Sequence, residues 1–532
     1  MRVKRAVLIF TVFLLVIIGL LPVAAMLIKS VMVNGHLSLS SYSGLFFSSH
    51  SRNLMGHSLV LSLWVTLLTT IIGLPLGILF AKTNLPFRRV FAVLFTIPLL
   101  IPPYINAISW FDLLGRGGIM ARLLGQAWAK TTSSWLFGLP GCVLVLFSVF
   151  MPIVMLLTMT YLKTIDPRLE EAGRLVSRWP KVLREITVPL ILPSVLLAAV
   201  LVFLLTFGEF GVPNFLRYDV YAVESFIQFS ASYNFGAATA AAVPLAVVTL
   251  LVLLAERVFL RERTYQIRPS PGRSGWLVIK LGSLRKWLFV LVAAVCFVTV
   301  IVPILVLVIR SAHISTYRAA LEKAGDSILR SLSYAAIGAS LLTLVGFLSG
   351  YLIYNRLLPF WRSVDSLTLF LFALPGTVIG IGLISFWNRP LTNFIYATPA
   401  IIIIGYIAKY TVLTSRITVS QLAQIPASME EAAQMVGAGW LRRMRVIIIP
   451  LARRGLLAGW LVGYIFSLRD TEITMMVYPP GHDTLPVRIF TLMANGSPQL
   501  IAALCVILIS VSLLPIGIFW MIYKFTVRTG ME

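Results

Sequence analysis

The sequence predicts an all-α polytopic membrane protein with about 12 transmembrane helices, arranged as two parallel repeats of six helices. Three observations lead to this prediction: an apolar composition, a series of long apolar runs and an internal duplication. The chain has 532 residues, of which 59% are hydrophobic and 12% are charged, and its mean hydropathy is +0.93. A water-soluble protein of this size cannot cover so much apolar surface, so lipid must be the solvent for most of the chain.

The apolar runs define the predicted spans. Each is close to the length of about 20 residues that a helix needs to cross the hydrocarbon core. The runs are too long and too continuous for the strands of a transmembrane barrel, which leaves helices as the solution for a backbone in lipid. The predicted spans are residues 6–28, 57–80, 90–111, 136–160, 190–212, 237–256, 287–309, 329–354, 365–387, 395–415, 452–476 and 499–523.

The first run, which follows Met-Arg-Val-Lys-Arg, has the alternative interpretation of a secretory signal. Its apolar stretch is longer than the roughly 7–15 residues of a signal-peptide core, and no clean small-residue cleavage site follows it. We therefore expect it to be retained as the first span.

The net charge of +25 is a signal of topology rather than of nucleic-acid binding. When the N-terminus is placed in the cytoplasm, 30 of the 44 Lys and Arg residues fall in inside segments, 12 in outside segments and two within spans. This bias is the one that the positive-inside rule describes. It predicts a multi-pass protein with both termini in the cytoplasm and gives no support to nucleic acid as a partner.

The two halves of the chain repeat each other. The stretch from Ser58 aligns with the stretch from Ser331 at an offset of 273, and downstream Pro98 and Trp110 align with Pro375 and Trp387 at an offset of 277. We therefore predict a first repeat at 1–256, a cytoplasmic linker at 257–286 and a second repeat at 287–532. Because each repeat holds an even number of spans, both start on the same side of the membrane.

Each repeat carries a charged segment between its fourth and fifth spans, at about 163–189 and about 425–450. In the second segment, Ser428 is placed to cap a short helix with Glu431 completing a capping box, and Gly437 can end that helix. A separate basic helix is expected at 440–446. In the first segment, Asp166 can cap, and Pro167 suits the first helical position.

Two interpretations of these charged segments are open. A basic amphipathic helix can rest on anionic lipid. The paired glutamates favour the other interpretation, a docking surface for a second protein, because anionic lipid would repel them. The small alanine and glycine side chains also suit a surface that another protein approaches closely.

The two segments resemble the EAA loop of permease subunits of bacterial ABC importers. The second segment fits that pattern throughout, with Glu431, Ala432, Ala433, Gly437, Ile447, Ile449 and Pro450. The first departs from it, because Gly173 replaces the second alanine, Ser177 stands in place of the glycine, and the spacing from Glu171 to Pro189 is one residue short. The resemblance implies the type I permease fold and coupling to an ATPase through Glu170, Glu171, Ala172, Gly173, Ser177, Glu430, Glu431, Ala432, Ala433 and Gly437.

The resemblance also implies the partners and the place of this chain. In that family, two copies of a nucleotide-binding ATPase subunit grip the two loops, and an external binding protein delivers the solute at the bacterial cytoplasmic membrane. The sequence has no GxxxxGK[ST] phosphate loop, so we expect ATP and Mg²⁺ to be used by the partner. The chain is then not an enzyme, has no catalytic residues and binds no cofactor.

Three stretches resemble the ferric-iron importers in particular, and they begin at Ile97, Phe207 and Val477. Ferric iron is therefore the expected solute. Related permeases for thiamine, phosphonate, polyamine or sugar phosphate share much of the same pattern and remain alternatives.

Four ionisable residues fall at membrane depth, namely Glu209, Arg469, Asp470 and Glu472, and they are candidates for a substrate pathway. Carboxylates are hard oxygen ligands that suit a ferric ion. The alternative is that Arg469 pairs with Asp470 or Glu472 and holds helices together. The histidines are scattered, and the three cysteines are far apart in sequence, so no resident metal site is predicted.

Two other classes of protein remain possible on sequence grounds. An ion-coupled secondary transporter would also contain internal repeats, but it would need acidic relays within the membrane, and such residues are sparse here. A membrane-bound assembly protein could use the charged segments merely as docking sites. The repeats of a secondary transporter would not need a matched charged segment that faces the cytoplasm.

Overall fold

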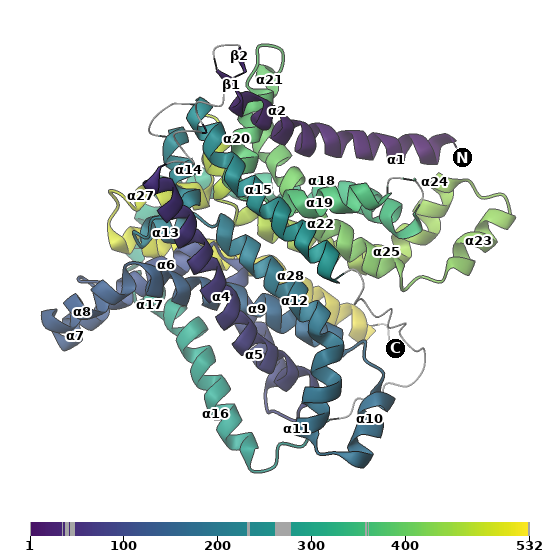
Figure 1. Ribbon diagram of the computed structural model, residues 1–532, viewed down its shortest axis with the longest axis horizontal. Coiled ribbons are helices and arrows are strands. Elements are labelled where there is room, and N and C mark those ends of the chain that lie inside the picture. The colour runs from purple at the N-terminus through teal and green to yellow at the C-terminus, as the bar shows by residue number, and fades with distance from the viewer. Residues whose placement is uncertain are drawn as a thin grey trace. The chain divides into compact units, whose positions relative to one another are not determined.

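The computed structural model describes residues 2–33, 36–37, 42, 48–230, 235–260, 278–356, 359 and 361–529. The described chain is almost entirely helical, with one two-stranded antiparallel ribbon of β1 and β2 (Figure 1). Most of the predicted linker, residues 261–277, lies outside the described residues.

The chain forms two compact units, and each is described by itself. Unit 1 comprises residues 1–48, 225–246 and 314–532, and unit 2 comprises residues 49–224 and 247–313. The elements of unit 1 are α1 Arg2–Leu15, η1 Val16–Leu20, α2 Leu21–Ser30, β1 Met32–Val33, β2 His36–Leu37, α18 Ile314–Asn355, α19 Trp361–Ala373, α20 Gly376–Trp387, α21 Asn393–Tyr396, α22 Ala400–Leu422, α23 Ala427–Met435, α24 Trp440–Arg443, η5 Met444–Ile448, α25 Ile449–Leu468, α26 Glu472–Val477, α27 Leu485–Leu492 and α28 Pro498–Thr529. The elements of unit 2 are α4 Ser49–Lys82, α5 Arg88–Thr96, η2 Ile97–Leu100, α6 Pro103–Leu114, α7 Ile119–Leu124, α8 Gln126–Leu136, α9 Leu139–Leu162, α10 Pro167–Val176, α11 Trp179–Val182, η3 Leu183–Thr187, α12 Val188–Gly208, α13 Gly211–Phe215, α16 Leu284–Cys296, η4 Phe297–Ile301 and α17 Val302–Arg310. The helices α14 Tyr221–Ser230 and α15 Phe235–Leu260 run from one unit into the other.

Ten helices of the described chain are long and apolar enough to cross a membrane, and two bent pairs raise the number to as many as 12. The bent pairs occupy the third and ninth predicted spans. In the first pair the helices meet at 99°, and in the second pair they meet at 109°. Each of these two predicted spans therefore consists of two helices joined at a sharp bend.

Proline explains both bends. Pro102 precedes α6 and Pro375 precedes α20, each in an extended conformation at the helix N-cap, and a proline ring there cannot continue the preceding helix. The first residues of α6 and α20 are related by an offset of 273, and so are their last residues. The predicted shift to an offset of 277 in this stretch is wrong, because the structure keeps the upstream offset through the bend.

Glycines bring the second and fourth spans of each repeat into close contact. Gly73 and Gly77 of α4 face α9, and Gly346 and Gly350 of α18 face α22. A Cβ at Gly77 would lie 2.6 Å from Thr158 Cβ and 2.8 Å from the Met155 carbonyl oxygen. Such small-residue contacts let helix backbones approach in a membrane, where apolar side chains gain little from leaving lipid.

Replacing Gly77 with leucine is expected to lower the midpoint of thermal unfolding of the detergent-purified protein markedly. Overpacking of a filled contact costs about 1–3 kcal/mol. The control is Gly56→Leu on the same helix, because a Cβ at Gly56 meets no atom within 4 Å. Equal destabilisation by the two changes would contradict the close-packing interpretation.

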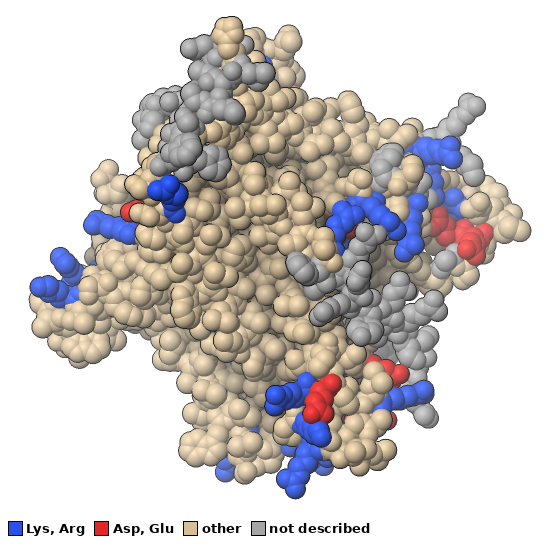
Figure 2. Space-filling view, viewed as in Figure 1, with Lys and Arg blue, Asp and Glu red and all other residues tan. Residues whose placement is uncertain are grey.

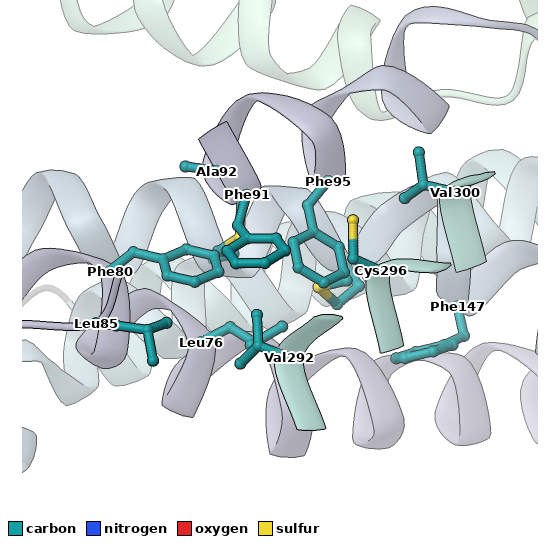
Figure 3. Packing of buried hydrophobic residues seen from close by; sticks show 12 residues of the cluster. Leu76, Phe80, Leu85, Phe91, Ala92, Phe95, Phe147, Val292, Cys296 and Val300 are labelled. Carbon is teal, nitrogen blue, oxygen red and sulfur yellow. The ribbon is translucent and has the colours of Figure 1, made fainter. Parts of the chain in front are cut away.

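The compact units do not coincide with the predicted sequence repeats, because the first span of each repeat packs in the unit formed mainly by the other repeat. In unit 1, α2 lies along α20, and a Cβ at Gly382 would come within 3.1 Å of the Pro22 backbone (Figure 1). In unit 2, α16 joins the core of α4, α5 and α9, where Val292 and Cys296 pack among Phe80, Phe91 and Phe95 (Figure 3). The two repeats are thus interwoven through their first spans.

Candidate functional site

The first charged segment forms a short helix, as predicted. The helix α10 begins at Pro167, and the Asp166 carboxylate caps it by accepting a hydrogen bond of 3.0 Å from the Arg168 backbone nitrogen. It ends at Ser177 in an extended conformation rather than a left-handed one, with the Ser177 amide bonded to the Gly173 carbonyl. Because serine replaces glycine here, the backbone leaves the C-terminus of α10 in a different conformation from the one that the family pattern implies.

The second charged segment forms the helix α23, which begins at Ala427 after Pro426. The predicted capping box of Ser428 and Glu431 is wrong, because Ser428 lies inside the helix. The predicted glycine end is confirmed: Gly437 has a φ of 78°, its amide bonds the Gln434 carbonyl, and the Ala438 amide bonds the Ala433 carbonyl. These two bonds form a Schellman motif, which needs a residue that tolerates the left-handed region.

The return legs of both segments are continuous with the following spans. Residues 179–208 and 440–468 are each one helical candidate span. The basic helix predicted at 440–446 begins at Trp440, as expected, but it continues into the following span without a break. Each leg contains a π-helical turn, η3 and η5, and the two turns are related by an offset of 261. Single π turns within α-helices often mark functional positions.

The first glutamate of each pair points inward. Glu170 is fully buried, its carboxylate lies 2.7 Å from Lys82 Nζ, and it accepts a hydrogen bond of 2.9 Å from Thr187 Oγ1. Glu430 accepts a hydrogen bond of 3.0 Å from Tyr351 Oη and lies 3.9 Å from Arg443. Each inner glutamate thus fastens its loop helix to the cytoplasmic end predicted for the second span of its repeat, α4 or α18.

The second glutamates, Glu171 and Glu431, are exposed, as are Ala172 and Ala432. Both glutamates of each pair were predicted from the sequence as contacts for a partner. The structure separates them, because Glu170 is fully buried and Glu430 is 21% exposed, whereas the second glutamate of each pair is exposed. Gly173 and Ala433 are half-buried against their own segments, with Gly173 close to Ile186 and Val182.

Each loop helix also ends in an apolar tip that was not predicted from the sequence. The tips are Leu175 with Val176 and Met435 with Val436, and these four side chains are between 84% and 89% exposed. The tips are related by an offset of 260, which is also the offset of the charged segments themselves. Figure 2 shows acidic and basic side chains gathered over the regions of α10 and α23. Exposed apolar side chains within a charged surface are typical of a protein-binding site.

Two other segments of the chain contact the residues that hold the inner glutamates. In unit 2, the end of the linker runs beside α4, where the Ile279 amide donates 2.7 Å to the carbonyl of Lys82 and the Asn84 amide donates to the Ile279 carbonyl. In unit 1, Lys4 Nζ lies 5.3 Å from the centre of the Tyr351 ring, which in turn holds Glu430. Lys82 and Tyr351, which hold the inner glutamates, therefore each contact the chain just before the first span of a repeat.

The candidate pathway residues separate into two arrangements. Glu209 in unit 2 accepts hydrogen bonds from the amides of Gly211 and Val212 and so caps the helix that follows. Asp470 in unit 1 accepts 2.7 Å from Tyr410 Oη and 3.0 Å from both the amide and the hydroxyl of Thr474. Both carboxylates are buried, and each accepts hydrogen bonds within its own unit.

Glu472 and Arg469 do not pair as the helix-holding interpretation expected. The ion pair of Glu472 is with Lys409 Nζ at 2.9 Å, and Glu472 also accepts a hydrogen bond from the Gly376 amide. The Arg469 guanidinium lies over the Phe466 ring at 4.6 Å. Asp470 and Glu472 do join helices, because both contact residues of α22. The basic partner of Glu472 comes from the fourth span of the repeat rather than from its neighbour in sequence.

Replacing Lys409 with methionine is expected to destabilise the protein by about 3–5 kcal/mol, because it leaves the largely buried Glu472 without its charge partner. The measurement is the thermal unfolding midpoint of the purified protein. Adding Glu472→Gln should recover most of the loss. A double variant no more stable than the Lys409 variant would contradict a direct interaction.

The described residues contain no group of three His, Cys, Asp or Glu side chains that could hold a metal ion. Cys142, Cys296 and Cys505 are buried, as small apolar side chains are. The arrangement that stands out in the described chain is therefore that of the charged segments. Its distinctive parts are two exposed loop helices, each braced by an inward-facing glutamate.

Comparison with known proteins gives matches over most of the chain. The signature of the family described as "binding-protein-dependent transport system inner membrane component" matches residues 73–264 and 343–521, once in each predicted repeat. The ferric transport system permease protein FbpB of Actinobacillus pleuropneumoniae is 24% identical over 452 residues, covering 81% of this chain and 65% of that protein. The Fe(3+)-transport system permease protein FbpB 2 of Haemophilus influenzae is 22% identical over 493 residues, covering 90% of this chain and 92% of that protein. The spermidine/putrescine transport system permease protein PotC of Escherichia coli is 25% identical over 236 residues, covering 40% of this chain and 84% of that protein.

Proposed function

Because the chain belongs to the family of binding-protein-dependent transport system inner membrane components, we propose that it is the permease of an ATP-driven importer for ferric iron. An external binding protein delivers the solute, and two copies of a separate ATPase subunit drive its passage. The chain lies in the bacterial cytoplasmic membrane with both termini in the cytoplasm.

The observation that carries the proposal is the pair of loop helices. Each repeat exposes one glutamate and one apolar tip at corresponding positions, on a helix that is braced from within. Two matched surfaces suit two copies of one partner. The buried pair of Lys82 and Glu170 gives a path by which movement of α10 reaches α4, and Tyr351 and Glu430 give the corresponding path between α23 and α18.

Ferric iron is proposed from the printed names of the relatives that match most of the chain. Two of them are ferric transport permeases, whereas the polyamine permease matches 40% of the chain. Polyamine is therefore the first competing solute, followed by thiamine, phosphonate and sugar phosphate. Because the acidic residues at membrane depth accept hydrogen bonds from groups of their own units, we propose that the binding protein makes the selection.

ATP hydrolysis is assigned to the partner. No GxxxxGK[ST] loop occurs in the sequence, and that loop supplies the backbone amides and the lysine that hold the phosphates. The chain then contributes no catalytic residue and no bound cofactor.

Reconstitution into proteoliposomes tests this proposal. The chain is combined with an ATPase subunit and a binding protein from the same organism, and uptake of ferric iron is measured with ATP inside the vesicles. Uptake should require both partners and should fail with an ATPase whose phosphate-loop lysine is replaced. Uptake driven by an ion gradient without ATP would instead indicate a secondary transporter, and ATP-dependent uptake of spermidine but not iron would overturn the solute.

A further inference from the structure

Residues 115–138 join the end of α6 to the start of α9 and fold into a hairpin of the helices α7 and α8 (Figure 1). Gly125 makes the turn between them with a φ of 89°, a conformation that favours glycine. The corresponding connection of the second repeat, residues 388–399, is half as long and holds only the short α21. The hairpin therefore belongs to the first repeat alone.

One face of α8 is fastened to the spans. Ala129, Ser133 and Leu136 are buried, at positions that share a side of the helix. Thr132 Oγ1 donates a hydrogen bond of 3.0 Å to the carbonyl of Leu114, the last residue of α6. These contacts hold α8, about 16 Å long, close to the ends of the two spans that it joins.

A second face of α8 is aromatic and exposed. Trp128 and Trp135 are 55% and 48% exposed, and because they lie two helical turns apart they share one side of the helix. Lys130 and Ser134 are also exposed and lie on a different side, since a helix advances by about 100° per residue. The hairpin thus presents a large apolar surface and a polar surface that are separated around the same axis.

The neighbouring α7 extends both features. Leu123 and Leu124 are 70% and 52% exposed. The stretch 113–138 contains Arg116, Arg122 and Lys130 and no acidic residue. Exposed tryptophan and leucine combined with exclusively basic charge are typical of a helix that lies in the interfacial region of a bilayer.

We propose that the α7–α8 hairpin lies in the interfacial region of the membrane, with Trp128 and Trp135 at the boundary of headgroups and acyl chains and its basic residues at anionic headgroups. The hairpin leads directly into α9, which is long and apolar enough to cross a membrane, and it follows α6, which belongs to the first bent pair. Its apolar face therefore stays within the length of the hairpin from the end of α9. The partner is the lipid of the leaflet at which α6 ends and α9 begins, which is the external leaflet in the proposed topology.

Site-directed spin labelling of the full chain in lipid nanodiscs tests the proposal. Single cysteines are introduced as Trp128→Cys and Trp135→Cys on the apolar side, and as Lys130→Cys and Ser134→Cys on the polar side. The unaltered chain serves as the labelling blank, because its own three cysteines are buried. Relaxation of each nitroxide by oxygen, which concentrates in lipid, is compared with relaxation by a water-soluble nickel chelate.

Relaxation by oxygen should exceed relaxation by the nickel chelate at positions 128 and 135. At positions 130 and 134, relaxation by the nickel chelate should be the greater of the two. Changing the nanodisc lipid from phosphatidylcholine to a mixture with phosphatidylglycerol should raise the ratio of relaxation by oxygen to relaxation by the nickel chelate at position 135. Nickel dominance at all four positions would overturn the proposal, because the hairpin would then stand in water. Protection of positions 128 and 135 only after addition of the binding protein would likewise overturn it, in favour of a protein contact.

Discussion

Replacing Met435 with aspartate is expected to reduce ATP-driven uptake about 100-fold or more and to prevent copurification of the ATPase, while membrane insertion stays normal. Met435 is 87% exposed at the apolar tip of α23, so its loss removes little packing within the chain. Burial of a carboxylate in an apolar interface costs several kcal/mol when no partner compensates it, and about 1.4 kcal/mol corresponds to a tenfold change in binding. The measurement is uptake in proteoliposomes together with ATPase recovery on the purified permease.

The matched control is Met435→Leu, which keeps an apolar tip of similar volume and should retain both uptake and copurification. Leu175→Asp makes the corresponding change on α10. If each loop binds one ATPase subunit, Leu175→Asp should also reduce uptake. The reduction should be smaller than for Met435→Asp if the different helix end at Ser177 weakens the contact of α10 with the ATPase. Normal uptake by both aspartate variants would show that the tips are not docking surfaces.

The two glutamates of the second segment have different roles although they are neighbours. Glu431 is exposed, whereas Glu430 is held by Tyr351. The sequence could predict the segment and its place in each repeat, because paired charge within an apolar chain is a strong local signal. It could not predict which glutamate turns inward, since that depends on side chains such as Lys82 and Tyr351, which lie on other helices.

The same limit explains the bends and the exchanged first spans. Hydropathy gives the position of a span along the sequence but does not report the direction of the helix axis. An apolar run with a sharp turn at Pro102 therefore has the same hydropathy as a straight helix. The prolines at 102, 103 and 375 were visible, and their inability to extend a preceding helix was the signal that could have found the bends. The packing of α2 along α20 has no such local signal, because apolar surfaces in lipid pair through shape.

The apolar tips were not predicted from the sequence for a related reason. In a chain that is 59% hydrophobic, a pair such as Leu175 and Val176 does not stand out. Only their exposure identifies them, and exposure is a property of the folded segment. Repetition at the offset of 260 was the available clue, since a matched pair of apolar residues inside a charged segment is difficult to explain by packing.

Replacing Lys82 with methionine is expected to destabilise the protein by about 3–5 kcal/mol, because Glu170 would remain fully buried without the ammonium group that lies 2.7 Å from it. The double variant Lys82→Met with Glu170→Leu should recover most of the stability, since an apolar pair of similar volume avoids the cost of burying charge. Thermal unfolding of the four proteins of this cycle gives the coupling free energy between the two side chains. Losses that simply add would show that the two side chains do not interact directly.

The same double variant distinguishes a brace from a merely stable contact. Lys82 joins α10 to the end of α4, and its carbonyl accepts a hydrogen bond from Ile279 in the linker. An apolar pair can restore packing but cannot restore a directional ion pair, so α10 should be free to move without carrying α4 with it. The expected result is a protein that is as stable as the wild type and still binds the ATPase, yet hydrolyses ATP without proportionate uptake. Normal coupling in that variant would assign the pair to stability alone and leave the transmission of movement to the continuous helix 179–208.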